Sequence, residues 1–88
     1  MSPRPLHQFK KGQAAYIHAI YPNPQFGHLD DTVAQRLADL GFSHGMSVML
    51  IATGLLGKGP FAVRLGNNAQ FSLRHAEAAK ILCLPHQF

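Results

Sequence analysis

Hydrophobic and polar residues alternate along five short segments of the chain, which is the pattern of strands that place one face in a core. The segments are 12–20, 47–53, 61–65, 69–73 and 81–84. Along the first segment Ala15 and Ile17 alternate with Tyr16 and His18, and along the second Val48, Leu50 and Ala52 alternate with Met49 and Ile51. Along the third and fourth we expect the core to be faced by Phe61, Val63, Leu65, Ala69, Phe71 and Leu73. The pattern therefore predicts five strands.

One segment between the first two strands has the period of a helix. Val33, Leu37 and Leu40 are spaced at i, i+4 and i+7 and form one apolar stripe. Gly41 follows and can end the helix in a left-handed conformation, so that Phe42 folds back onto Leu37 as in a Schellman motif. We expect Phe42 in the core, and Gly45 to turn the chain into the next strand.

The start of this helix has two interpretations. Asp30 can cap it while Leu29 packs against the first turn, or Thr32 can cap it in a capping box with Gln35. A shorter alanine-rich segment at 74–80 predicts a second helical turn before the last strand, and the sequence "GNN" at 66–68 predicts a tight hairpin.

These elements predict a mostly β fold, a small five-stranded antiparallel barrel with one inserted α-helix and a short helical turn before the last strand. The 88 residues are enough for a single domain over residues 1–88 with one core. Residues 1–8 contain Pro3 and Pro5, and we expect them to form a flexible arm.

The net charge of +4 and the pI near 9.7 raise nucleic acid as a partner. The basic residues are scattered, however, and only Lys10 and Lys11 are adjacent. Nucleic-acid binding therefore stays an alternative, and we expect no nucleic-acid partner. Because no long apolar run or signal peptide is visible, we expect a cytoplasmic protein without direct membrane insertion.

The sequence offers few groups for catalysis. "GLLGKG" at 54–59 lacks the first glycine and the hydroxyl residue of a phosphate-binding loop, because Ala52 and Gly59 stand at those positions. The chain has four carboxylates, and no motif places a nucleophile on a strained turn. We therefore expect no enzyme activity and no required cofactor.

Six histidines make a surface transition metal the main inorganic candidate, with Zn or Fe as the ion. His28 lies with Asp30 and Asp31 in the long loop at the helix start, where two ligands could form a site that a neighbouring molecule completes. Such a site would allow a metal-responsive homodimer. The alternative is that the histidines are exposed without a ligand. We expect Cys83, between Leu82 and Leu84, to be a small side chain that is buried or half-buried.

The segment 54–60 between the second and third strands breaks the alternating pattern. Leu55 and Leu56 are adjacent large aliphatic residues, followed by Lys58. Exposed apolar side chains at a loop tip often contact a partner, and we assign Leu55, Leu56 and Lys58 as candidate partner-binding residues. The alternative is that one of the leucines closes the end of the barrel.

Three further segments stand out in the sequence: "LHQFKKGQAAYIHAI", "RLADLGFSHGMSV" and "FSLRHAEAAKILCL". In their motifs, spacing and order they resemble the FeoA family of bacterial ferrous iron transport accessory proteins, and the resemblance covers roughly residues 6–84. The turn "LLGKGP" lacks the Asp common in the family, the loop 21–31 is longer than usual, and Cys83 replaces a β-branched residue.

The resemblance implies an SH3-like domain and a bacterial cytoplasmic protein that binds the cytoplasmic region of FeoB, the membrane ferrous iron transporter. A protein of this kind would support iron uptake through protein–protein interaction, peripheral to the inner membrane through its partner. No catalytic or binding residue is carried over from the family.

Overall fold

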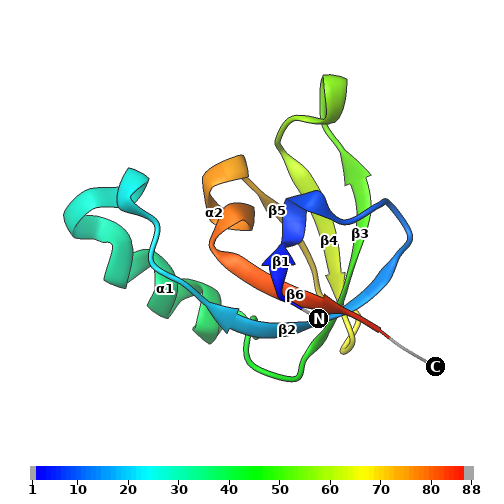
Figure 1. The fold of residues 1–88 in the computed structure, drawn as a ribbon, viewed down its shortest axis with the longest axis horizontal. Coiled ribbons are helices and arrows are strands. Elements are labelled where there is room, and N and C mark those ends of the chain that lie inside the picture. The colour runs from blue at the N-terminus through cyan, green and yellow to red at the C-terminus, as the bar shows by residue number, and fades with distance from the viewer. Residues whose placement is uncertain (1, 87–88) are drawn as a thin grey trace.

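A computed structural model describes residues 2–86 of the chain, without the side chain of Leu55, and shows an antiparallel sheet with one long helix beside it (Figure 1). The elements are β1 (Arg4–Pro5), η1 (Leu6–Gln8), β2 (Ala14–Ile20), η2 (Pro24–Leu29), α1 (Asp30–Asp39), β3 (Ser47–Thr53), η3 (Leu55–Gly57), β4 (Phe61–Leu65), β5 (Gln70–Leu73), α2 (His75–Ala79) and β6 (Ile81–Pro85), where η marks a 3₁₀ turn. The mostly β architecture with one helix and a short helical turn is confirmed.

The strands of residues 2–86 form one six-stranded sheet in the order β1-β6-β2-β3-β4-β5, in which every neighbouring pair is antiparallel. Figure 1 shows β3, β4 and β5 crossing the direction of β2 and β6, as a strongly bent sheet requires. β1 and β5 lie at the two ends of this order, so the sheet is open there. The predicted count of five strands was one too low.

The core lies inside the bend and takes side chains from every strand from β2 to β6. Its buried members are Leu6, Phe9, Ala15, Ile17, Leu37, Phe42, Val48, Leu50, Phe61, Val63, Leu65, Leu73, Ala78, Ile81 and Cys83. Most of the predicted inward residues are among them, because alternation places every second side chain on the concave face. Phe71 packs against the core half-buried.

Ala52 is exposed, although it continues the alternation of Val48 and Leu50, which are both buried. The pairing of β3 with β4 shifts between Leu50 and Ala52. A β-bulge of this kind changes which face the following residues take, and the sequence pattern does not reveal it.

Residues 4–8 differ from the flexible arm predicted over 1–8. Arg4 pairs with Cys83 and Pro5 with Leu82 at the edge of the sheet. Leu6 is fully buried in the core, and the Arg4 guanidinium lies over the Phe9 ring at 4.4 Å. Pro5 fits this edge strand because an edge position does not require every backbone N–H.

The end of α1 is the predicted Schellman motif. Gly41 has a φ of 109°, its N–H donates to the carbonyl of Ala38 at 3.0 Å, and the N–H of Phe42 donates to the carbonyl of Leu37 at 3.0 Å. These two bonds satisfy carbonyl groups that a helix end otherwise leaves free. Phe42 is fully buried, as expected.

The start of α1 has neither of the predicted caps. Leu29 takes the N-cap position with no side-chain hydrogen bond, and 52% of its surface is exposed. Asp30 lies in the first helical turn and its carboxylate accepts from the N–H of Asn23 at 3.0 Å. Both predicted caps are wrong, because the Asp30 carboxylate is engaged outside its own helix and Thr32 lies within the first turn of α1.

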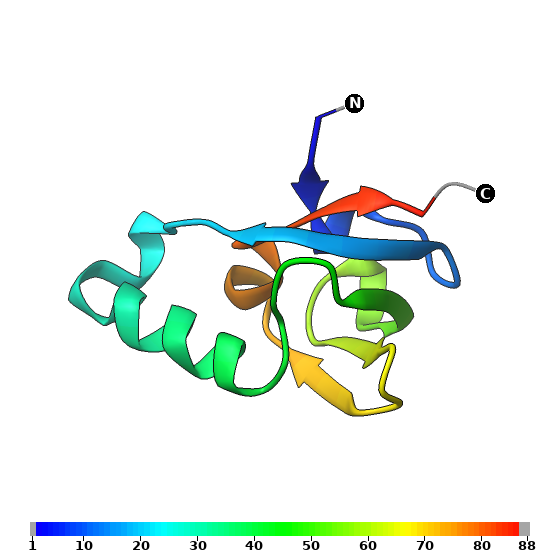
Figure 2. The same ribbon diagram turned by 90° about the horizontal axis from the view of Figure 1, so that it is seen from below.

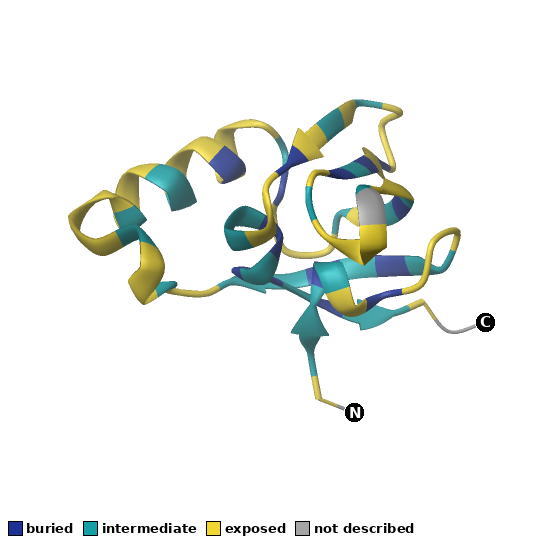
Figure 3. Ribbon diagram, turned by 90° about the horizontal axis from the view of Figure 1, so that it is seen from above, coloured by how far each residue is buried: buried dark blue, intermediate teal, exposed yellow. Residues whose placement is uncertain are grey.

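Only part of the predicted apolar stripe of α1 enters the core. Leu37 is buried and Val33 is half-buried, whereas Leu40 is 40% exposed. The helix extends to one side of the sheet (Figures 1 and 2), and most of it is exposed (Figure 3). Leu40 stays outside because the chain turns at Gly41 and brings Phe42 into the core instead.

A polar cluster that we call the latch, made of Asn23, Asp30 and Lys80, joins the start of α1 to the region between α2 and β6. Lys80 is 1% exposed and its ammonium group pairs with the Asp30 carboxylate. The Asn23 side chain donates to the carbonyl of Ala76 at 3.0 Å, and the N–H of Tyr21 donates to the carbonyl of Lys80 at 2.8 Å. A buried ammonium needs such a partner because desolvation strongly disfavours a charge.

The latch also sets the protonation of its carboxylate. The hydrogen bond from Lys80, with help from the N–H of Asn23 and the attraction of the ammonium charge, lowers the pKa of Asp30 below its usual value. The carboxylate is therefore easier to keep ionised in the folded protein than in the unfolded chain.

We expect Gly41→Ala to lower the free energy of unfolding by about 1–2 kcal/mol, because a side chain is strained at this φ. The new Cβ would also lie 3.2 Å from Cδ1 of Leu65. Urea unfolding measures the loss. Gly41→Asn is the matched control, since Asn adopts the left-handed conformation more readily, and an equal loss for both variants would contradict the proposed cause.

Asp30→Asn should lower the thermal midpoint by several degrees, because it leaves the Lys80 ammonium buried without a carboxylate. Lys80→Met should cost less, since it removes the buried charge and leaves Asp30 in contact with solvent. Thermal unfolding at neutral pH measures both variants. Asp31→Asn in the same helical turn is the control, and a loss as large as that of Asp30→Asn would show that the pair adds no stability.

The lowered pKa of Asp30 predicts a loss of stability in acid. The stability that comes from the ionised carboxylate is present above the unfolded value of about 4 and is lost as the pH falls through the lower folded value. The difference in unfolding free energy between the wild type and Asp30→Asn should therefore shrink from about pH 5 to about pH 2. Urea titrations across this range test it, and a constant difference would contradict it.

Candidate functional site

The loop of residues 54–60, which we call the β3–β4 loop, extends from one end of the sheet beyond its neighbours (Figure 1). Its η3 turn is held by the N–H of Gly57, which donates to the carbonyl of Gly54 at 3.2 Å. The loop closes so tightly that a Cβ at Gly54 would collide with the carbonyl oxygen of Lys58. Gly54 therefore determines the shape in which the tip is presented.

Leu56 stands at the tip of this loop with 86% of its surface exposed. Its backbone has φ 61° and ψ 27°, in the left-handed region that large L-residues rarely adopt. Both features work against folding stability, since the side chain gains no burial and the backbone is strained. Unfavourable conformations of this kind concentrate at functional sites, which marks the tip as a candidate contact.

The other two predicted contact residues lie on the same loop. Lys58 is exposed, whereas the side chain of Leu55 lies outside the described part of the chain. The alternative that a leucine closes the end of the barrel is wrong for Leu56. The structure thus presents an exposed aliphatic side chain and an exposed ammonium group two residues apart.

A pair of histidines lies at the base of the loop. The rings of His7 and His75 have centroids 4.3 Å apart, and both lie near the ring of Phe61. Burial, with a smaller effect of the His75 charge, lowers the pKa of His7, and its Nδ1 atom is buried with no hydrogen-bond partner in residues 2–86. Sequence reasoning missed this pair because it treated residues 1–8 as an arm.

The predicted metal residues are close in sequence but have different surroundings. Asp30 belongs to the latch, where it pairs with Lys80, while His28 and Asp31 are exposed. Within residues 2–86, no group of three or more His, Cys, Asp or Glu side chains is arranged to hold a metal ion. Cys83 is fully buried, as expected, and burial raises the pKa of its thiol to about 12.

A shallow depression of about 380 Å³ lies where β2, β3 and β4 run side by side. Ala14, Val48, Met49 and Leu65 contribute to its apolar lining, and Arg64 and His86 are its ionisable residues. No carboxylate lines it, so this depression of the described chain offers no pair of acids for general acid–base catalysis.

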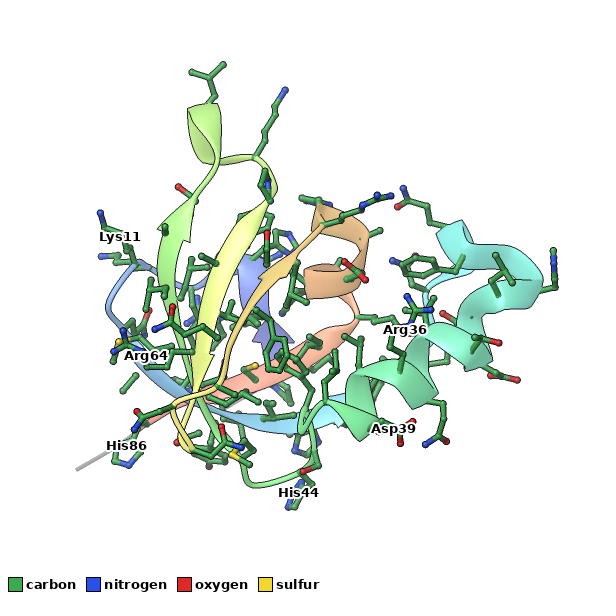
Figure 4. All side chains as sticks on the ribbon, turned by 180° about the vertical axis from the view of Figure 1, so that it is seen from behind. Lys11, Arg36, Asp39, His44, Arg64 and His86 are labelled. Atoms are coloured by element: carbon green, nitrogen blue, oxygen red, sulfur yellow. The ribbon has the colours of Figure 1, made fainter. Side chains whose placement is uncertain are left out.

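The basic residues do not form one stripe. Figure 4 shows Lys11 and Arg64 on one side of the molecule and Arg36 on α1 at the other. Continuous basic tracks are what nucleic-acid grooves use to follow a backbone, so the placement of these three cations adds no support to the nucleic-acid alternative.

No helix within residues 2–86 combines the length and the apolar character that crossing a bilayer demands.

Structural comparison relates the chain to several solved proteins. It resembles FeoA of Stenotrophomonas maltophilia, solved in complex with zinc, at 28% identity and a TM-score of 0.75 over 96% of this chain and 89% of the other. FeoA of Chlorobium tepidum is 25% identical with a TM-score of 0.72, over 97% of this chain and 70% of the other. A manganese-dependent transcriptional repressor in complex with manganese shares only the fold, at 18% identity and a TM-score of 0.77 over 96% of this chain and 37% of the other.

A search of curated proteins by sequence finds no match. The sequence model of one family, described as the FeoA domain, matches residues 4–85. This match spans every strand, both helices and the β3–β4 loop, and the S. maltophilia protein of the same family is described as an SH3 domain. The chain therefore belongs to the FeoA domain family.

Proposed function

We propose that this protein is an accessory factor of ferrous iron uptake, which acts by binding to the cytoplasmic region of the transporter FeoB. The S. maltophilia relative is described as possibly acting as a bacterial ferrous iron transport activating factor, and membership of the same family supports this role for the present chain. The protein works by association and carries out no reaction of its own. It resides in the cytoplasm and reaches the inner membrane through its partner.

The docking site is inferred from Leu56, which combines an exposed side chain with a strained backbone. The turn bond from Gly57 to Gly54 and the tight closure at Gly54 favour one shape of the loop. A side chain presented in this way loses less conformational entropy when it enters a pocket, so more of its burial contributes to affinity. Lys58 adds a positive charge beside it, which favours an acidic rim on the partner. The predicted contact therefore consists of Leu56 and Lys58, together with Leu55.

Leu56→Asp should weaken binding to the purified cytoplasmic region of FeoB by about tenfold or more, because it places a carboxylate in an apolar contact. Isothermal titration calorimetry measures the affinity. Leu29→Asp is the matched control, since Leu29 is an exposed leucine directly before α1, and Figure 1 shows α1 on the side of the molecule away from the β3–β4 loop. Equal affinity of Leu56→Asp and the wild type would reject the loop as the docking site.

Leu56→Gly separates binding from folding. Glycine adopts the left-handed backbone without strain, so this variant should unfold at the same urea concentration as the wild type or a higher one, while its affinity for FeoB falls.

In a strain that lacks the protein, wild-type protein should restore ferrous iron uptake and Leu56→Asp should not. Normal uptake in the strain without any complementation would contradict the accessory role itself.

A further inference from the structure

Two histidines from separate segments lie together on the side of the molecule away from the β3–β4 loop. His18 belongs to β2, and His44 lies in the connection between α1 and β3, where Figure 4 shows it at the end opposite η3. Their ring centroids are 5.9 Å apart and their planes make an angle of 65°. His44 is exposed and His18 half-buried, so solvent reaches the pair.

One hydrogen bond determines the tautomer of His44. Its Nδ1 atom lies 2.7 Å from the carbonyl oxygen of His18. A carbonyl can only accept a hydrogen bond, so Nδ1 carries the hydrogen and donates. In the neutral ring, Nε2 then holds a free lone pair. Histidines that bind metals are usually oriented in this way, through a bond from the other ring nitrogen to a carbonyl or carboxylate.

The backbone around the two histidines is held by further bonds. The N–H of Ile17 donates to the carbonyl of Met46 at 2.8 Å, and the N–H of Gly45 donates to the carbonyl of Ile17 at 2.8 Å. Gly45 makes the intervening turn with a φ of 87°, and the pairing of β2 with β6 shifts between Ile17 and Ala19, which places His18 at a bulge. The two rings are therefore presented from a fixed backbone and not from a free loop.

We propose that His18 and His44 bind one divalent transition-metal ion of the Zn²⁺ class, with His44 contributing Nε2. Imidazole nitrogen suits zinc, copper, nickel and ferrous iron better than the hard ions calcium and magnesium. Two imidazoles that share a tetrahedral ion through bonds of about 2.0–2.1 Å have centroids about 5 Å apart. The rings of His18 and His44 are 5.9 Å apart, so binding requires them to approach each other by less than about 1 Å, which side-chain rotation can supply.

The site is open. Residues 2–86 supply no cluster of three or more ligands, so the remaining coordination positions go to water or to a donor from another molecule. Structural zinc sites are closed by four protein ligands. A two-histidine site therefore suits reversible binding and exchange of the ion, with no contribution required for folding.

Zinc titration followed by NMR of the ¹⁵N-labelled histidine rings tests the proposal directly on the wild-type protein. Before zinc is added, His44 should show the pattern of a ring with hydrogen on Nδ1. On addition of zinc, Nε2 of His44 and one ring nitrogen of His18 should shift together with a stoichiometry of one ion per chain. The absence of these shifts at millimolar zinc would overturn the proposal.

Variants give a second readout by calorimetry. His44→Ala and His18→Ala should each weaken zinc binding by about tenfold or more, and His18→Ala keeps the backbone carbonyl that orients His44. His28→Ala is the matched control and should bind zinc like the wild type. Unchanged affinity in both pair variants, or a loss only in His28→Ala, would overturn the site. Leu56→Asp should keep full zinc affinity, so the result is independent of FeoB docking.

Discussion

The buried ammonium group of Lys80 is the constraint on which the arrangement of this small fold depends. A charge that is 1% exposed must have a partner, and Asp30 supplies it from a position 50 residues earlier in the chain. Because Asp30 begins α1, the same ion pair fixes where the helix starts. Asn23 extends the constraint through hydrogen bonds to Asp30 and Ala76. The long loop before α1 is therefore attached to α2.

This constraint explains why the helix can extend to one side of the sheet with so little of its surface buried. At its first turn α1 is held by the latch, and at its end by the Schellman motif that carries Phe42 into the core. Leu37 provides the principal apolar contact between these two points. The loop over residues 21–31 contains the residues predicted to bind a metal. Part of this loop, Asn23 and Asp30, instead attaches the helix through the latch.

Local patterns in the sequence predicted what local forces determine. Alternation located the main strands, and the order of Leu37, Gly41 and Phe42 located the helix end together with its hydrogen bonds. Contacts between distant residues were not predictable, because no pattern within one segment reports them. Among these are the pairing of Arg4 with Cys83, the ion pair of Asp30 with Lys80, and the approach of His44 to His18. The break in alternation indicated the two leucines of the β3–β4 loop. The left-handed backbone of Leu56 was not predictable from the sequence.

The residues with a left-handed backbone show which conformations folding stability accounts for and which one it does not. In the described part of the chain, Leu56 is one of seven residues with positive φ. The other six are Gly12, Gly27, Gly41, Gly45, Gly57 and Asn68. Each of these is a residue type that tolerates the left-handed region, as folding stability favours. Leu56 departs from that rule at the most exposed large apolar position described, where asparagine or glycine would serve the turn better. Stability therefore gives no reason for a leucine there, whereas the proposed docking to a partner would give one.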